Sequence, residues 1–247
     1  MSHVFDFAVL GCCGSYAAAG RCCSGYLLRA GGAVLWIDCG NGTLAALQEQ
    51  VSLSELTGVI VSHVHPDHCV DLFGLDVAFR YGGFRNHVQV FAPSAARSTL
   101  GTLAGGSFGT AFEWIDLEGP SPRVQHRDLE LQFSHTDHPV PTYAVRARTT
   151  EGTSIAYTAD TGPAWDSSVF GDSIDLLVAE ATYLNDFRGA PIHLTPAEAA
   201  SVAVSRNVKR LLLTHLWPGV DPELSVREAA AVFENVAAAH DGLQLQL

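Results

Sequence analysis

The stretch VSHVHPDHCVDL, residues 61–72, packs three histidines and two aspartates into twelve positions. In an extended segment, side chains two residues apart point the same way, so His63 and His65 can face one site together. A proline then turns the chain, and Asp67 and His68 can face a neighbouring site. Neutral imidazole and carboxylate suit Zn²⁺, and mixed nitrogen and oxygen sets also admit Mn²⁺ or Fe. The stretch therefore predicts a metal cage rather than a polar loop that happens to contain histidine.

These side chains are too many for one tetrahedral ion that keeps an open position, which predicts two ions roughly 3.5–4 Å apart. Further ligands must then come from elsewhere in the chain. The candidates at the ends of predicted strands are His138, Asp160 and His215, of which Asp160 could bridge both ions. His135 competes with His138, because it lies only three residues away. The histidines without such a context are expected at the surface: His3, His87, His126 and His240.

Four short apolar runs carry a titratable side chain at or near their end. GVIVSH ends at His63, SIAYTAD at Asp160 and KRLLLTH at His215, while DLLVAEA carries Glu180. Runs of Val, Ile and Leu of this length indicate strands buried on both faces, and in layered α/β folds the chemistry gathers at strand ends. LELQFSH at 129–135 alternates apolar and polar residues, as a half-exposed strand does. More strands are predicted at FDFAVLG, SGYLLRA, AVLWIDCG and VQVFAP.

Helices are predicted between the strands. GTLAALQEQ is one, and CVDLFGLDVAFRYG after the opening motif is another. TPAE at 195–198 is a capping box with proline at the first helical position, and it predicts a helix to about Asn207. SVRE at 225–228 has the same form and predicts a helix to about His240. Strands followed by helices, twice over and without a linker, predict an α/β fold with one domain over residues 1–247.

Composition limits the partners of this chain. Its formal net charge is −12, from 14 basic and 26 acidic residues. Since phosphate contacts need clustered Lys and Arg, a broad surface for nucleic acid is not expected. The first residues lack the basic and apolar regions of a signal peptide, and no apolar run approaches the roughly 20 residues that span a bilayer. A cytoplasmic protein without membrane contact is predicted.

Six cysteines lie at positions 12, 13, 22, 23, 39 and 69, all in the first third of the chain. The adjacent pairs do not have the C-x-x-C spacing of a zinc site. Without an export signal, reduced and mostly buried thiols are predicted. The alternative is a redox-sensitive loop around residues 12–23.

Four motifs occur in the order known from one large family. They are SHVHPDH (62–68), DHPVPTYAV (137–145), YTADTG (157–162) and LLLTHL (211–216). With them the chain resembles the metallo-β-lactamase superfamily, and VLGCCGS and IDCGNG resemble the opening strands of that family. The resemblance implies an αββα sandwich, with two central mixed sheets flanked by helices. It also favours His138 over His135 as a ligand.

The resemblance also assigns the ligands to two metal ions. One ion would be held by His63, His65 and His138, and the other by Asp67, His68 and His215. Asp160 would bridge the two ions, with a hydroxide shared between them that attacks the substrate. Asp67 could orient this hydroxide or accept its proton.

Two further motifs resemble the ribonuclease Z-like branch of the superfamily. They are AEATY (179–183) and IHLT (192–195), and they place Glu180 and His193 where that branch has a histidine paired with a glutamate near the scissile phosphate. Without the resemblance, His193 would be read as a loop residue and Glu180 as a charge at a strand end. Transfer-RNA processing members carry an extended RNA-gripping arm, expected between the metal motifs that here hold His138 and Asp160. Here only 21 residues, 139–159, separate His138 from Asp160, which leaves no room for it.

The leading hypothesis is a di-metal phosphodiesterase that cleaves a small phosphodiester such as a cyclic nucleotide, as small bacterial members of the branch do. The second is a ribonuclease Z-type endonuclease acting on transfer RNA, with RNA as a possible but disfavoured partner. The third is a hydrolase of a thioester, lactone or β-lactam, and the fourth is a metal-binding protein without activity that serves as a binding module. A homodimer is expected from resemblance to the branch alone.

Overall fold

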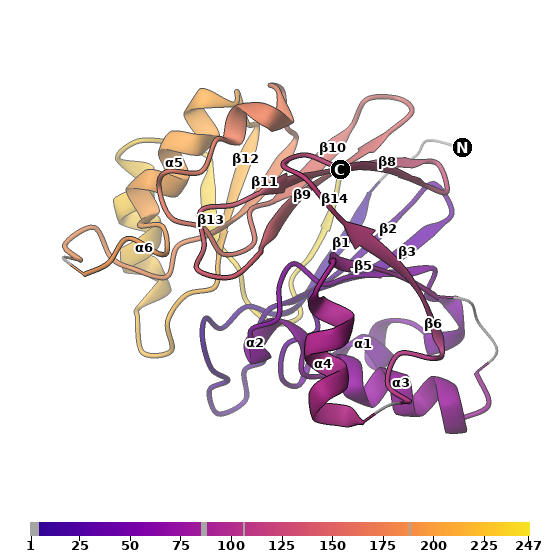
Figure 1. Ribbon diagram of the computed structural model, residues 1–247. Helices are drawn as coiled ribbons and strands as arrows, with labels where there is room; N and C mark the ends of the chain where they lie inside the picture. The colour runs from indigo at the N-terminus through magenta and orange to yellow at the C-terminus, as the bar shows by residue number, and fades with distance from the viewer. Residues whose placement is uncertain (1–4, 85–87, 106, 188) are drawn as a thin grey trace.

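Two seven-stranded sheets pack face to face, and helices cover the outer face of each (Figure 1). The computed structural model describes residues 5–84, 88–105, 107–187 and 189–247. The strand order is β14-β1-β2-β3-β4-β5-β6 in the first sheet and β13-β12-β11-β10-β9-β8-β7 in the second. The predicted αββα sandwich is therefore confirmed.

The first sheet consists of β1 (Asp6–Gly11), β2 (Gly25–Ala30), β3 (Ala33–Ile37), β4 (Gly58–Ile60), β5 (Val88–Pro93), β6 (Phe112–Leu117) and β14 (Gln244–Gln246). The second consists of β7 (Arg123–His126), β8 (Leu129–His135), β9 (Tyr143–Thr149), β10 (Ser154–Tyr157), β11 (Leu176–Glu180), β12 (Arg210–Thr214) and β13 (Val236–Ala238). The helices are α1 (Thr43–Gln50), α2 (Pro66–Cys69), α3 (Leu72–Tyr81), α4 (Ala96–Ala104), α5 (Pro196–Ser205) and α6 (Pro222–Ala230). Two 3₁₀ turns are η1 (Leu53–Glu55) and η2 (Ser167–Phe170).

Three apolar layers follow from this arrangement. The middle layer lies between the sheets and includes Leu28, Phe91 and Phe133, all fully buried. A second layer lies between the first sheet and helices α1, α3 and α4, and a third between the second sheet and helices α5 and α6. Because each sheet is covered on both faces, its central strands read as continuous apolar runs in the sequence.

Parallel strands place the sites of chemistry at one end of the sandwich. In the first sheet β3 runs parallel to β4, and in the second β10, β11 and β12 run parallel to one another. The carboxyl ends of parallel strands meet at the same edge of a sheet, so the polar residues that follow these strands are brought together. Among the described residues, no helix is long and apolar enough to cross a membrane.

The last predicted helix is wrong in both of its bounds. Helix α6 begins at Pro222, because the Asp221 side chain accepts a hydrogen bond from the Glu223 amide and caps it. Ser225, predicted as the cap, is buried within this helix. The helix ends at Ala230, and Val236–Ala238 instead add strand β13 to the edge of the second sheet beside β12. Pairing with a neighbouring strand thus overrides the helical propensity of an alanine-rich segment.

The helix predicted at CVDLFGLDVAFRYG is present as α3, which begins at Leu72 rather than Cys69, and Cys69 instead ends the separate short helix α2. Asp71 lies between the two helices, where its carboxylate accepts a hydrogen bond from the Leu44 amide. Strand β8 is also more buried than its alternating pattern predicts. Its polar residues Gln132 and Ser134 are covered by the segment around η2, through Gln132 Nε2 to Val169 O and Trp165 Nε1 to Ser134 Oγ.

His126 is buried rather than at the surface, with 4% of its area exposed. Its Nε2 lies 2.9 Å from Thr57 Oγ1 and its Nδ1 2.9 Å from Gln89 Oε1, so it joins the two sheets. Burial and the nearby Arg127 lower its pKa to about 4.

His240 is exposed as predicted, while His3 and His87 lie outside the described residues. All six cysteines are free, and five of them are buried, as predicted.

Replacement of a leucine in the middle layer tests the packing. Leu28→Ala removes a fully buried side chain and should lower the free energy of unfolding by about 3 kcal/mol, since a cavity remains. Leu103→Ala is the matched control, because Leu103 is 80% exposed and its truncation should cost less than about 0.5 kcal/mol. Denaturant unfolding of both variants measures the difference. Equal losses would contradict the layer assignment.

Candidate metal centre

The seven predicted ligands converge at the carboxyl ends of the parallel strands. Two groups form, each with ligand atoms within 4.8 Å of one another: His63, His65, His138 and Asp160 in the first, and Asp67, His68 and His215 in the second. This division is the one expected from the resemblance. Asp160 lies between the groups, since its Oδ2 is 3.7 Å from His63 Nε2 and its Oδ1 is 3.5 Å from His215 Nε2. His193 lies beside Asp160 and His215.

Ring nitrogens in this cluster face one another at short range. His65 Nδ1 lies 3.0 Å from His63 Nε2 and 3.2 Å from His138 Nε2. His68 Nε2 lies 3.2 Å from His215 Nε2. In addition, the buried Asp160 Oδ1 has no hydrogen-bond partner among the described residues. Converging nitrogen and carboxylate donors with an unsatisfied buried oxygen fit divalent cations, because a cation can satisfy all of these lone pairs at once.

The far side of most of these imidazole rings is fixed by an oxygen atom. The ring Nδ1 lies 3.0 Å from Ser62 Oγ in His63, 2.7 Å from Asp38 Oδ2 in His68, and 2.7 Å from Thr182 Oγ1 in His215. His138 Nδ1 lies 3.3 Å from the Ile192 carbonyl oxygen. Oxygen partners of this kind orient histidine ligands and leave the other nitrogen free for a metal. The arrangement is therefore that of a prepared ligand set.

Asp38 is a site residue that the sequence analysis did not single out. It is fully buried and accepts hydrogen bonds from Ser62 N at 2.8 Å, Ser62 Oγ at 2.9 Å and Tyr157 Oη at 2.9 Å, besides its contact with His68. It thereby joins the first sheet, helix α2 and the second sheet. The signal was present, because AVLWID has the same form as the other runs that end in a titratable residue.

His193 and Glu180 form the pair that the sequence suggested. His193 Nδ1 lies 2.9 Å from Glu180 Oε1, which also accepts the Thr161 amide at 2.8 Å. The other oxygen, Oε2, accepts the Thr182 hydroxyl at 2.9 Å. Since Thr182 Oγ1 in turn contacts His215 Nδ1, Glu180 helps to orient both His193 and a predicted metal ligand. This link through Thr182 was not foreseen.

The histidines of the centre lower the pKa of the carboxylate that lies between them. Burial would raise the pKa of Asp160, but His215, His68 and His63 outweigh it and hold this pKa well below its usual range. Burial lowers the pKa of His63 well below its usual value. For His193, burial acts to lower the pKa, but the carboxylates of Glu180 and Asp160 outweigh it and raise the pKa. The imidazoles of the centre thus differ in basicity, since the pKa of His63 is lowered and that of His193 is raised.

The backbone around the centre adopts conformations that are uncommon outside glycine. Asp38, Ala159 and His215 have φ values of 56°, 51° and 55°. Such left-handed residues persist where the surroundings impose them, often at functional sites. Gly40 serves a related purpose, because a Cβ at this position would collide with the Asp67 carbonyl oxygen. Close approach of these segments brings α2 and its ligands against the end of β3.

His135 does not join the cluster, in agreement with the preference for His138. It is exposed at the end of β8, and its ring lies edge-on to Tyr143 with the ring centroids 5.5 Å apart.

A model of the "Beta-lactamase superfamily domain" matches residues 34–216. This chain belongs to the metallo-β-lactamase superfamily. An uncharacterized protein of Mycobacterium tuberculosis is 34% identical over 235 residues, which cover 92% of this chain and 86% of the relative. The probable metallo-hydrolase YhfI of Bacillus subtilis is 32% identical over 232 residues, covering 91% and 92%. The chain is a metallo-hydrolase of the ribonuclease Z-like branch.

Solved structures of this superfamily share the whole fold. The crystal structure of YhfI superimposes with a TM-score of 0.88 at 29% identity and full coverage of both chains. The short form of human tRNase Z gives a TM-score of 0.77 at 21% identity, covering 97% of this chain and 98% of that one, and so shares the fold. Members of the superfamily use divalent metal ions, and the His and Asp clusters described above are where this chain could bind them.

Removal of the Asp38 carboxylate should weaken both the fold and the centre. Asp38→Ala leaves buried donors without an acceptor and frees the His68 ring, so we expect the free energy of unfolding to fall by about 3 kcal/mol or more and metal affinity to fall about tenfold or more. Calorimetry and competition with a chelator measure the two effects.

Tyr157→Phe is the matched control for this variant. It removes one hydrogen bond to Asp38 and leaves His68 oriented, so it should cost about 1–2 kcal/mol and leave metal affinity unchanged. An Asp38→Ala protein that binds metal as tightly as the parent would refute the orienting role.

Proposed function

We propose that this metallo-hydrolase is a phosphodiesterase that cleaves a small phosphodiester such as a cyclic nucleotide. The observation that carries the proposal is the buried Glu180–His193 pair beside the ligand cluster. The Nδ1 atom of His193 is hydrogen-bonded to Glu180, which leaves its Nε2 atom for a substrate. Its ring centroid lies 5.5 Å from that of His138 and 5.4 Å from that of His215, so it flanks both groups of ligands.

The ligand sets assign a place to each of two divalent ions. His63, His65 and His138 would hold one, and Asp67, His68 and His215 the other, with Asp160 shared. When bound, such ions would stabilise negative charge on the phosphoryl oxygens and make water a better nucleophile near neutral pH. Imidazole and carboxylate donors favour Zn²⁺, and Mn²⁺ or Fe are alternatives.

Three side chains around this centre would position the reactants and transfer protons. Asp67, of which 8% is exposed, would orient the attacking water or accept its proton. His193 would donate a hydrogen bond to a phosphoryl oxygen or protonate the leaving oxygen. Glu180 would hold the His193 ring in one orientation by accepting its Nδ1–H, and its charge would favour the imidazolium form, whose Nε2–H is the donor.

Aromatic side chains beside His193 support a nucleotide as the substrate. The Tyr183 ring centroid lies 5.4 Å from that of His193, and the Phe187 ring stacks on Tyr183 at 3.6 Å. Trp217, 41% exposed, lies 6.5 Å from Tyr183. Exposed rings next to a phosphate site suit stacking against a nucleobase.

Small substrates are favoured over transfer RNA by two observations. Residues 139–159 form the strands β9 and β10 with a short turn between them, and leave no length for an arm that grips RNA. The net charge of −12 also disfavours a long phosphate backbone. Ribonuclease Z-type processing is the second candidate, since related chains carry that name.

Acyl hydrolysis is a further alternative for which the Glu180–His193 pair has no evident use. A cytoplasmic homodimer is part of the proposal.

Two histidine variants should separate metal binding from turnover. His193→Ala should keep the metal content and lower kcat about 100-fold or more, because a donor to the reacting phosphate is lost. His65→Ala should lose metal and activity together. His135→Ala is the control and should change neither, because this histidine is exposed and outside the cluster. Wild-type turnover by His193→Ala would remove the role assigned to it.

Replacement of Trp217 tests the nucleotide. Trp217→Ala should raise KM for a cyclic nucleotide roughly tenfold and leave kcat nearly unchanged, because stacking contributes about 1–3 kcal/mol. Trp217→Phe keeps a ring and should remain close to the parent. Hydrolysis of a glycerophosphodiester, which lacks a base, should be insensitive to both changes. An equal loss on both substrates would argue against base stacking.

A panel of substrates tests the proposed function as a whole. Metal-replete protein is assayed with cyclic nucleotides, a glycerophosphodiester, a 3′-extended transfer-RNA precursor and a thioester. We expect turnover of the small phosphodiesters. Preference for the RNA precursor would favour the second candidate, and thioester turnover without phosphodiester turnover would favour the third. Fewer than one ion per chain and no activity after addition of Zn²⁺ or Mn²⁺ would favour a binding module.

A further inference from the structure

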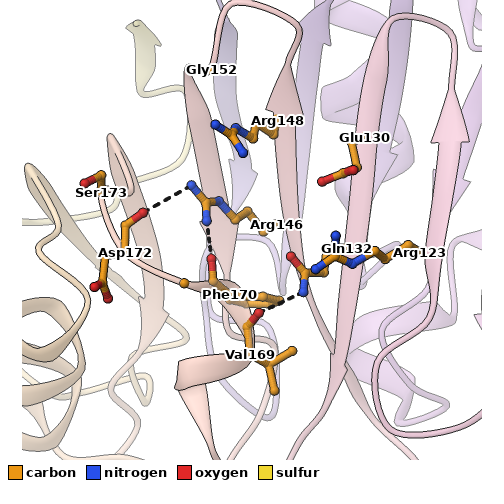
Figure 2. Close-up of a pocket in the computed structure, with 11 residues that line it drawn as sticks. Arg123, Glu130, Gln132, Arg146, Arg148, Gly152, Val169, Phe170, Asp172 and Ser173 are labelled. Carbon is orange, nitrogen blue, oxygen red and sulfur yellow. Dashed lines mark hydrogen bonds between the residues drawn. The ribbon is translucent and has the colours of Figure 1, made fainter.

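A polar cavity lies on the second sheet, and none of its lining residues belongs to the metal ligands. It has a volume of about 350 Å³ and is formed by strands β7, β8 and β9 together with η2 and the residues after it (Figure 2). Its lining residues are Arg123, Glu130, Gln132, Arg146, Arg148, Gly152, Val169, Phe170, Gly171, Asp172 and Ser173.

Three arginines of neighbouring strands share this cavity. Arg146 and Arg148 are two positions apart on β9 and therefore point to the same face, and Arg123 on β7 is in register with Gln132, which in turn is in register with Arg146. Figure 2 shows all three side chains on this face. The whole chain has only 14 basic residues against 26 acidic ones. A concentration of positive charge at one cavity is thus unusual for this protein.

The guanidinium of Arg146 is buried, and no carboxylate among the described residues forms an ion pair with it. Arg146 is 8% exposed, and its acceptors are the carbonyl oxygens of Phe170 and Asp172 and the Ser154 hydroxyl. Its Nε has no hydrogen-bond partner among the described residues. Among the described residues, the lysines and arginines that form ion pairs are Arg80, Arg206, Lys209 and Arg227. The three arginines of the cavity are not among them. A buried charge satisfied by neutral oxygens alone is costly, and a bound anion would compensate it.

The acids nearest to this cavity are mostly engaged elsewhere. Asp172 Oδ1 pairs with Arg206 at 3.1 Å, and Figure 2 shows its carboxylate directed away from the arginines. Asp175, whose charge acts on Arg146, pairs with Lys209 at 2.7 Å. Glu130 is the remaining acid in the lining, and it is in register with Arg148. Three arginines against one glutamate leave an excess of two positive charges.

We propose that this cavity binds the phosphate group of a small molecule, either inorganic phosphate or a phosphomonoester. The planar guanidinium fork matches phosphate oxygens and forms paired hydrogen bonds with them. Gly152 and Gly171, with φ of 97° and 65°, line the cavity without side chains and leave the arginines accessible. A volume of about 350 Å³ exceeds that of a bare phosphate and suits a molecule of nucleotide size.

Titration calorimetry with adenosine 5′-monophosphate and with inorganic phosphate tests this site in the metal-loaded protein. The metal centre can also bind phosphate, so the same titrations are made with His65→Ala. We expect His65→Ala to retain one phosphate site. The double variant Arg123→Ala/Arg148→Ala, which changes two exposed residues and leaves Arg146 in place, should weaken that site tenfold or more.

Two further variants complete the design: one that should strengthen binding and one control outside the cavity. Glu130→Gln removes the one opposing acid and should strengthen binding about threefold. Arg97→Ala removes an exposed arginine of α4, outside the cavity, and should leave the affinity unchanged. Tighter binding of the nucleotide than of phosphate would identify a phosphomonoester site, and equal affinities would identify a site for free phosphate.

Two results would overturn the proposal. One is the disappearance of all phosphate binding in His65→Ala, which would leave the metal centre as the only site. The other is equal affinity of the double variant and Arg97→Ala. Neither result bears on the phosphodiesterase assay, because the arginines lie outside the centre and the double variant should hydrolyse phosphodiesters as the parent does.

Discussion

The fully buried carboxylate of Asp38 is the interaction on which the centre depends. A carboxylate without access to water must find donors within the protein, and Asp38 finds them in Ser62, His68 and Tyr157. These residues follow β4, lie in α2 and end β10, so one side chain determines how the first sheet, a ligand-bearing helix and the second sheet meet. The apolar layer between the sheets holds them together. Asp38 fixes how the two sheets and α2 are positioned at the end where the predicted metal ligands lie.

The same principle extends outward from Asp38 to the whole centre. Ser62 holds the ring of His63 and Thr182 holds that of His215, which belong to different ligand groups. Glu180 connects Thr182 to His193. Each histidine so fixed loses freedom before any metal arrives, which favours binding because the ordering cost is met on folding. Since the ligands come from both sheets, metal binding and the stability of the fold are linked.

Much of this could be predicted from the sequence, for physical reasons. Doubly buried strands leave continuous apolar runs, and the titratable residues after them, such as His63, Asp160 and His215, are conspicuous by contrast. Contacts that depend on tertiary partners left no such trace. His126 is buried between Thr57 and Gln89, and residues Val236–Ala238 form a strand only because β12 offers a free edge. Asp38 shared the visible pattern but lacked a histidine neighbour in sequence that would have drawn attention to it.

The pairing of β14 with β1 has a consequence for biosynthesis. Asp6 and Gln246 are bonded across this pair although they lie 240 positions apart in the sequence. One edge of β1 therefore stays unpaired while the intervening chain is made, on the order of 10 to 50 s at typical translation rates. During this interval a largely apolar strand edge is open to pairing with other nascent chains. In the completed fold β14 covers this edge, so the newly made chain is more open to such pairing than the folded protein.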